Sequence, residues 1–292
     1  MESARCKAFI ESVDKGSFRA AAEALGYTPS AVSQLVSALE KDLGINLLIR
    51  TKKGVQLTPE GKRLVPIVRS YLARELEMYQ LATELKGINI GELTISAYPS
   101  VATTWLPEIV RRFQDDYPGI QISIREGIRP EIFSHLEDHS ADMGFLAYAD
   151  PMPYEWIPLA EEEMIAAIPE NHPLAGQDRF PISEFSNYPI IMTSWGQDIE
   201  ILNILRDNGV HPDIKYTTYD TPAALAMVRM GLGISMVNEL SAQYWNDHLV
   251  KLPLDPPEKL TFGVAYTSEE HMTKAAKKFL AYAIRYLTQP EE

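Results

Sequence analysis

The chain has 292 residues, of which 46% are hydrophobic and 23% charged, and its net charge is −13. This length suits about two domains, and the composition is that of a globular protein with sizeable apolar cores. No apolar run reaches the roughly 20 residues of a membrane-spanning helix, the N-terminus has no secretory signal pattern, and the single cysteine excludes an internal disulfide, so we expect a cytoplasmic protein.

The charge is spread unevenly along the chain. Residues 1–66 carry ten basic and seven acidic side chains, a net charge of +3, so the remainder carries −16. A segment-wise asymmetry of this kind permits a DNA-facing N-terminal module on an acidic body.

The first 44 residues predict three short helices. Apolar residues recur three and four apart over about residues 2–13, which is one face of a helix, and two capped segments follow. The expected caps and stops are Ser17, Gly26, Thr28 and Gly44. The second and third helices are joined by a tight turn at 26–28, which predicts a helix-turn-helix whose second helix enters the major groove of DNA.

The start of that third helix carries side chains able to read base edges. Hydroxyl and amide groups suit this task, and a glutamine suits the N6 and N7 atoms of adenine. The candidates are Thr28, Pro29, Ser30, Ser33, Gln34 and Ser37. On its own such a cluster is more simply a plain capped helix start.

A basic turn follows between two short strand-like runs. It carries Arg50, Lys52 and Lys53, and such a wing binds backbone phosphates. Alone, this stretch reads equally as a solvated charged hairpin, and the combination with the preceding helices favours a winged DNA-binding module.

Residues 1–62 resemble the winged helix-turn-helix of LysR-type transcriptional regulators. The matching segments are SFRAAAEALG around Phe18–Leu25, TPSAVSQLVSALE at Thr28–Glu40, the stretch from Leu43 to Arg50, and LTPEG at Leu57–Gly61. Two positions depart from the family pattern, since Gln34 stands where many members carry a basic residue and Leu48-Ile49-Arg50 lacks the usual phenylalanine. The uncharged reading helix places phosphate binding on Arg50, Lys52 and Lys53.

A long helix is expected from Pro59 to about Lys86, capped by Thr58. Seven of its positions alternate four and three apart, as in the seam of a coiled coil. They are Leu64, Val68, Tyr71, Glu75, Met78, Ala82 and Leu85. Pro66 is expected to kink the helix. The seam predicts a homodimer, and a helix packed on its own domain is the alternative; the resemblance further implies a homotetramer.

After residue 91, strand-like and helix-like segments alternate, which predicts a largely parallel α/β sheet. Two such sets are present, so we expect two subdomains with a ligand cleft between them.

This half resembles the effector-binding domain of the same family, which is similar to periplasmic binding proteins. The matching segments are Leu106-Pro107, Phe113, Tyr117-Pro118, Ala141–Met143, His172–Ala175 and VRMGLGI at Val228–Ile234. Asn238 stands where a proline is usual. The implied fold class is α/β, with an N-terminal winged helix-turn-helix, a long linker helix and two α/β subdomains resembling periplasmic binding proteins.

The expected domains are a DNA-binding domain at 1–58, a linker helix at 59–90 and an effector-binding domain at 91–292. Within the last, subdomain I is expected at about 91–163 and 268–292, and subdomain II at about 164–267.

Candidate effector-binding residues lie where a strand ends and the next helix begins. Hydroxyl groups and free N–H groups at helix starts suit a carboxylate, so a small organic acid, another anion or a polar metabolite is expected. The candidates are Ser100, Ala102, Thr103 and Thr104 after the first strand, Arg129, then Thr193, Ser194 and Trp195, and finally Asp220 and Thr221. Read singly, each hydroxyl residue is more simply a helix cap, and Arg129 is more simply an ordinary surface side chain.

No catalytic or metal-binding pattern is present in the sequence. It has no nucleophile elbow, phosphate-binding glycine loop or HExxH helix, and His172 lies in a turn without a second ligand nearby. We therefore expect no enzyme and no cofactor, but a regulator that binds double-stranded promoter DNA with inverted-repeat half-sites and senses a small-molecule effector. The alternatives are an enzyme or solute-binding protein with an appended helical module, and a regulator whose pocket is vestigial.

Overall fold

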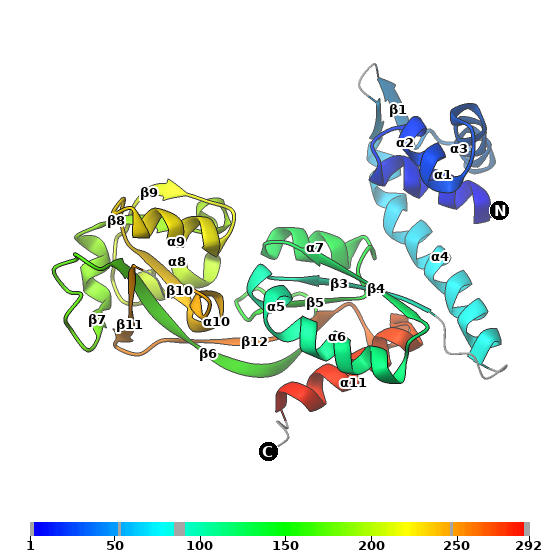
Figure 1. Cartoon of the computed structure of the whole chain (residues 1–292). Coiled ribbons are helices and arrows are strands. Elements are labelled where there is room, and N and C mark those ends of the chain that lie inside the picture. The colour runs from blue at the N-terminus through cyan, green and yellow to red at the C-terminus, as the bar shows by residue number, and fades with distance from the viewer. Residues whose placement is uncertain (1–2, 52–53, 85–90, 246–247, 289–292) are drawn as a thin grey trace.

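The computed structural model describes residues 3–51, 54–84, 91–245 and 248–288. It has an N-terminal head, a long helix and an elongated body of two lobes (Figure 1). The two wing lysines, Lys52 and Lys53, lie outside the described residues, as does Leu85 at the end of the expected seam.

The head is a winged helix-turn-helix. Its elements are α1 (Ser3–Asp14), α2 (Phe18–Leu25), α3 (Pro29–Leu43), β1 (Leu48–Thr51) and β2 (Gly54–Leu57), with β1 and β2 antiparallel. The expected caps are confirmed, because the Ser17 hydroxyl accepts a hydrogen bond from the Ala20 N–H at 3.2 Å and Gly26 ends α2 with φ at 69°, where a side chain is disfavoured. The helices enclose a core that includes Phe9, Val36 and Leu39.

The long helix α4 (Pro59–Glu84) begins at its expected cap, where the Thr58 hydroxyl accepts a hydrogen bond from the Gly61 N–H at 2.9 Å. The expected seam is divided between two surfaces. Leu64 and Val68 pack into the core of the head, whereas Tyr71 and Met78 are exposed. The assignment of Leu64 and Val68 to a dimer seam is therefore wrong, because the first turns of α4 complete the apolar core of their own domain.

The body begins with lobe I and continues into lobe II. Lobe I consists of β3 (Gly91–Ala97), α5 (Pro99–Thr103), α6 (Trp105–Asp116), β4 (Ile120–Glu126), α7 (Arg129–Glu137), β5 (Met143–Ala147) and the C-terminal α11 (Lys274–Thr288). Lobe II consists of β7 (Phe180–Pro181), β8 (Pro189–Met192), α8 (Ile199–Asp207), β9 (Asp213–Thr217), α9 (Thr221–Arg229), β10 (Ser235–Asn238), α10 (Glu239–Ala242) and β11 (Leu249–Asp255). Short 3₁₀ turns lie at Ile182–Ser186, Ser194–Gly196 and Glu269–His271.

Two long strands, β6 (Glu155–Pro169) and β12 (Lys259–Tyr266), run between the lobes (Figure 1). They pair antiparallel with each other, and β12 also pairs antiparallel with β5. The expectation of a largely parallel sheet is therefore wrong: β3 is parallel to β4 and β5, but the sheet as a whole is mixed. The reason is the connection itself, since the chain leaves lobe I through β6 and returns through β12 in the opposite direction.

Each lobe has its own apolar core. The core of lobe I includes Phe113, Phe145 and Phe279, and that of lobe II includes Phe180 and Phe185. Strand β6 contributes to both cores, with Leu159 in that of lobe I and Met164 in that of lobe II.

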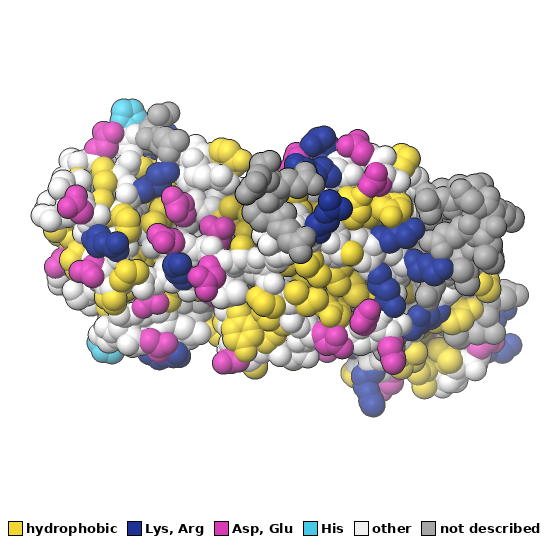
Figure 2. All heavy atoms as spheres, turned by 90° about the horizontal axis from the view of Figure 1, so that it is seen from below, with side chains coloured by type: hydrophobic (Ala, Val, Ile, Leu, Met, Phe, Trp, Pro, Cys, Tyr) yellow, Lys and Arg dark blue, Asp and Glu magenta, His cyan; other side chains and the backbone are white. Residues whose placement is uncertain are grey.

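Within the described residues, no helix is long and apolar enough to cross a membrane. The lower face of the molecule carries acidic and basic side chains interspersed rather than one patch of a single sign (Figure 2).

Candidate nucleic-acid interface and effector cleft

The reading helix α3 presents polar side chains at its N-terminal end. The Thr28 hydroxyl accepts a hydrogen bond from the Ala31 N–H at 3.2 Å and lies 3.0 Å from the Ser30 hydroxyl. Thr28, Pro29, Ser30 and Gln34 are exposed, while Ser33 and Ser37 are half-buried. Thr28 therefore caps α3 and still presents its side chain at the surface.

Arg50 ties the wing to the reading helix. One guanidinium nitrogen, Nη2, donates to the Ser37 hydroxyl at 2.7 Å, and the guanidinium lies 5.3 Å from the centre of the Phe18 ring. The arginine of β1 is therefore held against α3 and α2, at the edge of the surface that the polar side chains of α3 form.

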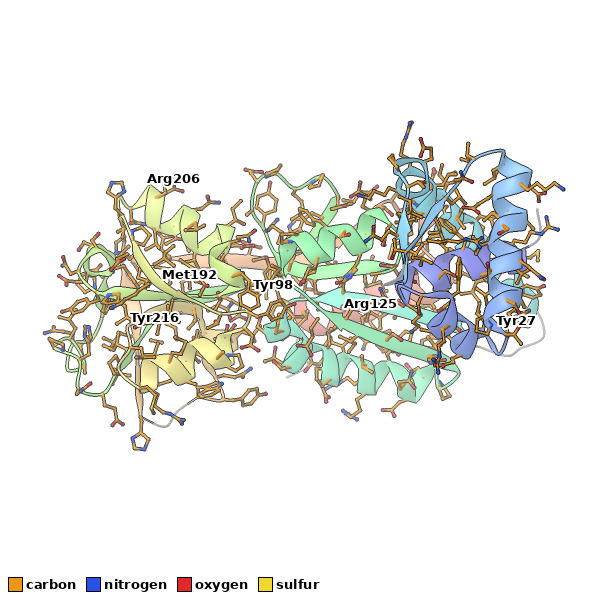
Figure 3. All side chains as sticks on the ribbon, turned by 90° about the horizontal axis from the view of Figure 1, so that it is seen from above. Tyr27, Tyr98, Arg125, Met192, Arg206 and Tyr216 are labelled. Carbon is orange, nitrogen blue, oxygen red and sulfur yellow. The ribbon has the colours of Figure 1, made fainter. Side chains whose placement is uncertain are left out.

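A cleft lies between the two lobes and encloses about 590 Å³, counting the space open to solvent. Five of the candidate effector-binding residues line it: Ser100, Thr193, Ser194, Asp220 and Thr221. Ser100 comes from lobe I and the others from lobe II, so the ends of strands in both lobes meet at one cavity. Tyr98, another lining residue, lies at the junction of the lobes (Figure 3).

Five candidates do not line this cleft: Ala102, Thr103, Thr104, Arg129 and Trp195. The Thr103 hydroxyl turns back to donate to the Pro99 carbonyl oxygen at 2.8 Å. Trp195 is 57% exposed, with its ring centre 6.0 Å from that of Tyr219.

Arg129 is occupied by protein partners. Its Nη2 donates to Glu200 Oε1 at 2.7 Å and to the Ala147 carbonyl oxygen at 2.6 Å, and Nη1 donates to the Ala149 carbonyl oxygen at 3.3 Å. The Tyr98 hydroxyl also donates to Glu200 Oε1, at 2.7 Å. Arg129 and Tyr98 belong to lobe I and Glu200 to lobe II, so this cluster crosses the cleft.

Several lining residues were not among the candidates from the sequence, including Tyr98, Asp198, Glu200 and Tyr219. Tyr98 follows β3 directly and Asp198 caps α8, so the strand-end rule could have found both. Glu200 lies inside a helix, and its partner Arg129 is 71 residues away, so no local pattern marks it.

The helix starts at the cleft are capped by their own carboxylates. Asp198 accepts from the Ile201 N–H at 3.3 Å, and Asp220 accepts from the Ala223 N–H at 3.0 Å. Burial, and then the neighbouring Glu200, raise the pKa of Asp198 to about 7. No lysine, arginine or histidine is among the described residues that line the cleft. The cleft is therefore rich in hydrogen-bond acceptors and poor in positive charge.

The described residues contain no group of three or more histidine, cysteine, aspartate or glutamate side chains placed to hold a metal ion. His172 lies beside Tyr188, with ring centres 4.3 Å apart, and its Nδ1 accepts from the Leu174 N–H at 3.2 Å, as expected of a turn residue.

Comparison with known proteins assigns both halves of the chain. Residues 4–62 match the family model of the bacterial regulatory helix-turn-helix protein, lysR family, and residues 87–288 match the LysR substrate binding domain. The chain is similar to the uncharacterized HTH-type transcriptional regulator YvbU of Bacillus subtilis, at 28% identity over 97% of this chain and 98% of that protein.

It is also similar to a probable hydrogen peroxide-inducible genes activator of Mycobacterium avium, at 27% identity over 79% of this chain and 76% of that protein. Among solved structures, a full-length OxyR variant from Pseudomonas aeruginosa shares the fold, with a TM-score of 0.75, 20% identity and coverage of 100% of this chain and 99% of that one. The chain belongs to the LysR family of DNA-binding transcription regulators, which are not enzymes.

Proposed function

We propose that α3 reads DNA directly and that the wing binds the phosphate backbone. The side chains assigned to base edges are Thr28, Pro29, Ser30, Ser33, Gln34 and Ser37, and those assigned to phosphates are Arg50, Lys52 and Lys53. Exposure of the start of α3, with Arg50 at its edge, supports this assignment.

The proposed target is a promoter with inverted-repeat half-sites, bound by a homodimer. Two reading helices related by a two-fold axis require two half-sites in inverted order. An exposed stripe on α4 supports the dimer: Ile67, Tyr71 and Met78 are 63%, 38% and 59% exposed and are spaced four and seven residues apart. The proposed complete assembly is a homotetramer.

The effector is proposed to be a small polar metabolite bound in the cleft between the lobes. The observation that carries this proposal is the cleft between the lobes, lined by polar side chains of Tyr98, Ser100, Thr193 and Asp198. Of the chemistries expected from the sequence, a neutral or positively charged polar molecule fits better than an organic acid. An anion would face the carboxyl of Asp198 without a positive partner, because no lysine, arginine or histidine is among the described residues that line the cleft and Arg129 is paired with Glu200.

Peroxide sensing, suggested by the description of the mycobacterial relative, is the second candidate. A thiol-based sensor needs an accessible cysteine with a lowered pKa. The one cysteine of this chain, Cys6, lies in the head, is fully buried, and has its pKa raised by that burial. The metabolite proposal is therefore preferred over a thiol switch.

The test is thermal unfolding of the full chain with matched pairs of small amines, alcohols and carboxylic acids. A ligand at about 100 times its Kd should raise Tm by roughly 5 °C or more. The variant Ser100→Tyr, which places a large ring at the cleft, should lose this shift. Thr103→Tyr, on the same helix but outside the cleft, should keep it.

A melting temperature that stays flat across the whole set would contradict the proposal and favour regulation through protein contacts alone. A shift produced only by carboxylic acids would contradict the chemical class.

A further inference from the structure

One arginine joins all three parts of the chain. Arg69 lies on α4 with only 11% of its side chain exposed, and it forms ion pairs with Asp14 at the end of α1 and with Asp138, which follows α7. Asp14 belongs to the head and Asp138 to lobe I. A buried guanidinium and two carboxylates thus help to fix the head relative to the body, together with Arg74 of α4, whose Nη2 donates to the Glu270 carbonyl oxygen at 2.8 Å.

The two ion pairs differ in geometry. The Asp14 carboxylate accepts a hydrogen bond from Arg69 Nη2. Arg69 Nε lies 3.8 Å from Asp138 Oδ2, which is beyond hydrogen-bond distance, and this buried Nε has no hydrogen-bond acceptor among the described residues. A small displacement of Asp138 toward Arg69 would complete the bond, and a buried unpaired donor favours such a movement.

Helix α7 begins after Ile128, which lines the effector cleft, and ends just before Asp138. Arg129, its first residue, binds Glu200 of lobe II at 2.7 Å, and the hydroxyl of Tyr219 of lobe II donates to Glu131 Oε2 at 2.7 Å. Helix α7 has nine residues and is therefore about 13 Å long at about 1.5 Å per residue. Its N-terminal end is thus held by lobe II and its C-terminal end faces the head.

We propose that α7 acts as a rigid lever that couples the cleft to the DNA-binding head, with Arg69 as the positioning residue that receives its movement. A change in the separation of the lobes pulls on α7 through Glu200 and Tyr219. The movement makes or breaks the Arg69–Asp138 contact, which reorients the head through Asp14. As a means of regulation by an effector, the lever rests on the proposed function of the cleft.

The coupling can be tested without any effector, through a double-mutant cycle on the full chain. The probe is a DNA duplex that the wild-type chain selects from a randomised pool. Glu200→Gln at the cleft should change the Kd for this duplex by about 5-fold or more, within the usual range of allosteric coupling. In an Asp138→Asn background the same change should alter Kd less than about 2-fold.

Amide hydrogen exchange in the head is a second measurement. It would not change if Glu200 had only a local structural role at the cleft. Glu200→Gln should change amide exchange in residues 10–16, around Asp14, and Asp138→Asn should abolish that change. Arg111→Gln is the matched control, because its ion pair with Glu108 lies within α6 and crosses no junction. It should change neither Kd nor exchange in the head.

If Glu200→Gln lowers Tm strongly, Tyr219→Phe replaces it, since this variant removes only the hydroxyl that reaches Glu131. Additive effects on log Kd, or unchanged exchange around Asp14, would overturn the lever. Because no effector is used, that result would leave ligand binding in the cleft, measured by thermal unfolding, unaffected.

Discussion

Asp198 combines a structural and an electrostatic task at the cleft. It caps α8, accepts a hydrogen bond from the Thr193 hydroxyl at 2.8 Å, and lies beside Glu200. Its carboxyl is buried, so the folded chain holds the proton more tightly than the unfolded chain does.

The pH dependence of stability should report this residue. The pKa of Asp198 is raised from 3.8 to about 7 in the folded state. The folded state is therefore favoured by this group below about pH 4, and the advantage is lost as the pH rises through about 7. Asp198→Asn, which stays neutral and keeps the capping oxygen, should gain stability relative to wild type between pH 5 and pH 8, by an amount on the order of 1–4 kcal/mol.

Chemical unfolding at the two pH values measures this difference. Asp207→Asn, an exposed aspartate on the same helix, is the control and should follow the wild type. Identical pH slopes for wild type and Asp198→Asn would refute the assignment.

Single residues were predictable from the sequence where their partners are local. The caps Ser17, Thr28 and Thr58 each bond to an N–H three residues further on, so the sequence neighbourhood contains the whole interaction. Arg129 was predicted as a ligand for an anion because its partner Glu200 is distant in the sequence, and only the folded chain brings the two together.

At the scale of elements, local patterning predicts helices and strands well but not their partners. The four–three spacing on α4 is visible in the sequence, yet Leu64 and Val68 pack into the apolar core of the head. Strand β6 runs from Glu155 to Pro169 and so passes from one lobe into the other. The strands that pair with β6 are distant from it in the sequence, so a short stretch of sequence does not identify them.

The exposed stripe on α4 leads to a prediction about assembly. Tyr71→Asp places a charge between Ile67 and Met78, which an apolar helix–helix contact would have to bury, so the dimer should dissociate. Sizing by light scattering at micromolar concentration should show an assembly smaller than that of the wild type. Tyr244→Asp, the same change at a tyrosine that is 72% exposed on the body, should leave the dimer intact. An unchanged dimer for Tyr71→Asp would contradict the role of this helix face.

At the scale of the whole molecule, the positive charge and the cleft lie in different parts of the chain. The first 66 residues carry a net charge of +3 and the rest −16, so attraction to DNA is confined to the head. The body carries the cleft, and α7 with Arg69 joins the two. Motifs along the chain sufficed to predict this division and the fold class, whereas the junction between α4, α7 and α1 depends on contacts between segments far apart in the sequence.

The central claim, that the head reads a two-fold DNA site through α3, is tested most directly by selection from a randomised duplex pool with the full-length wild type and Gln34→Ala. The wild type should enrich an inverted repeat. Gln34→Ala should enrich the same repeat with preference relaxed at one position in each half-site, by about 10-fold, because a good bidentate contact to a base discriminates by about 1–3 kcal/mol. The claim would be contradicted if the wild type enriched no repeat, or if Gln34→Ala kept the wild-type preference at every position.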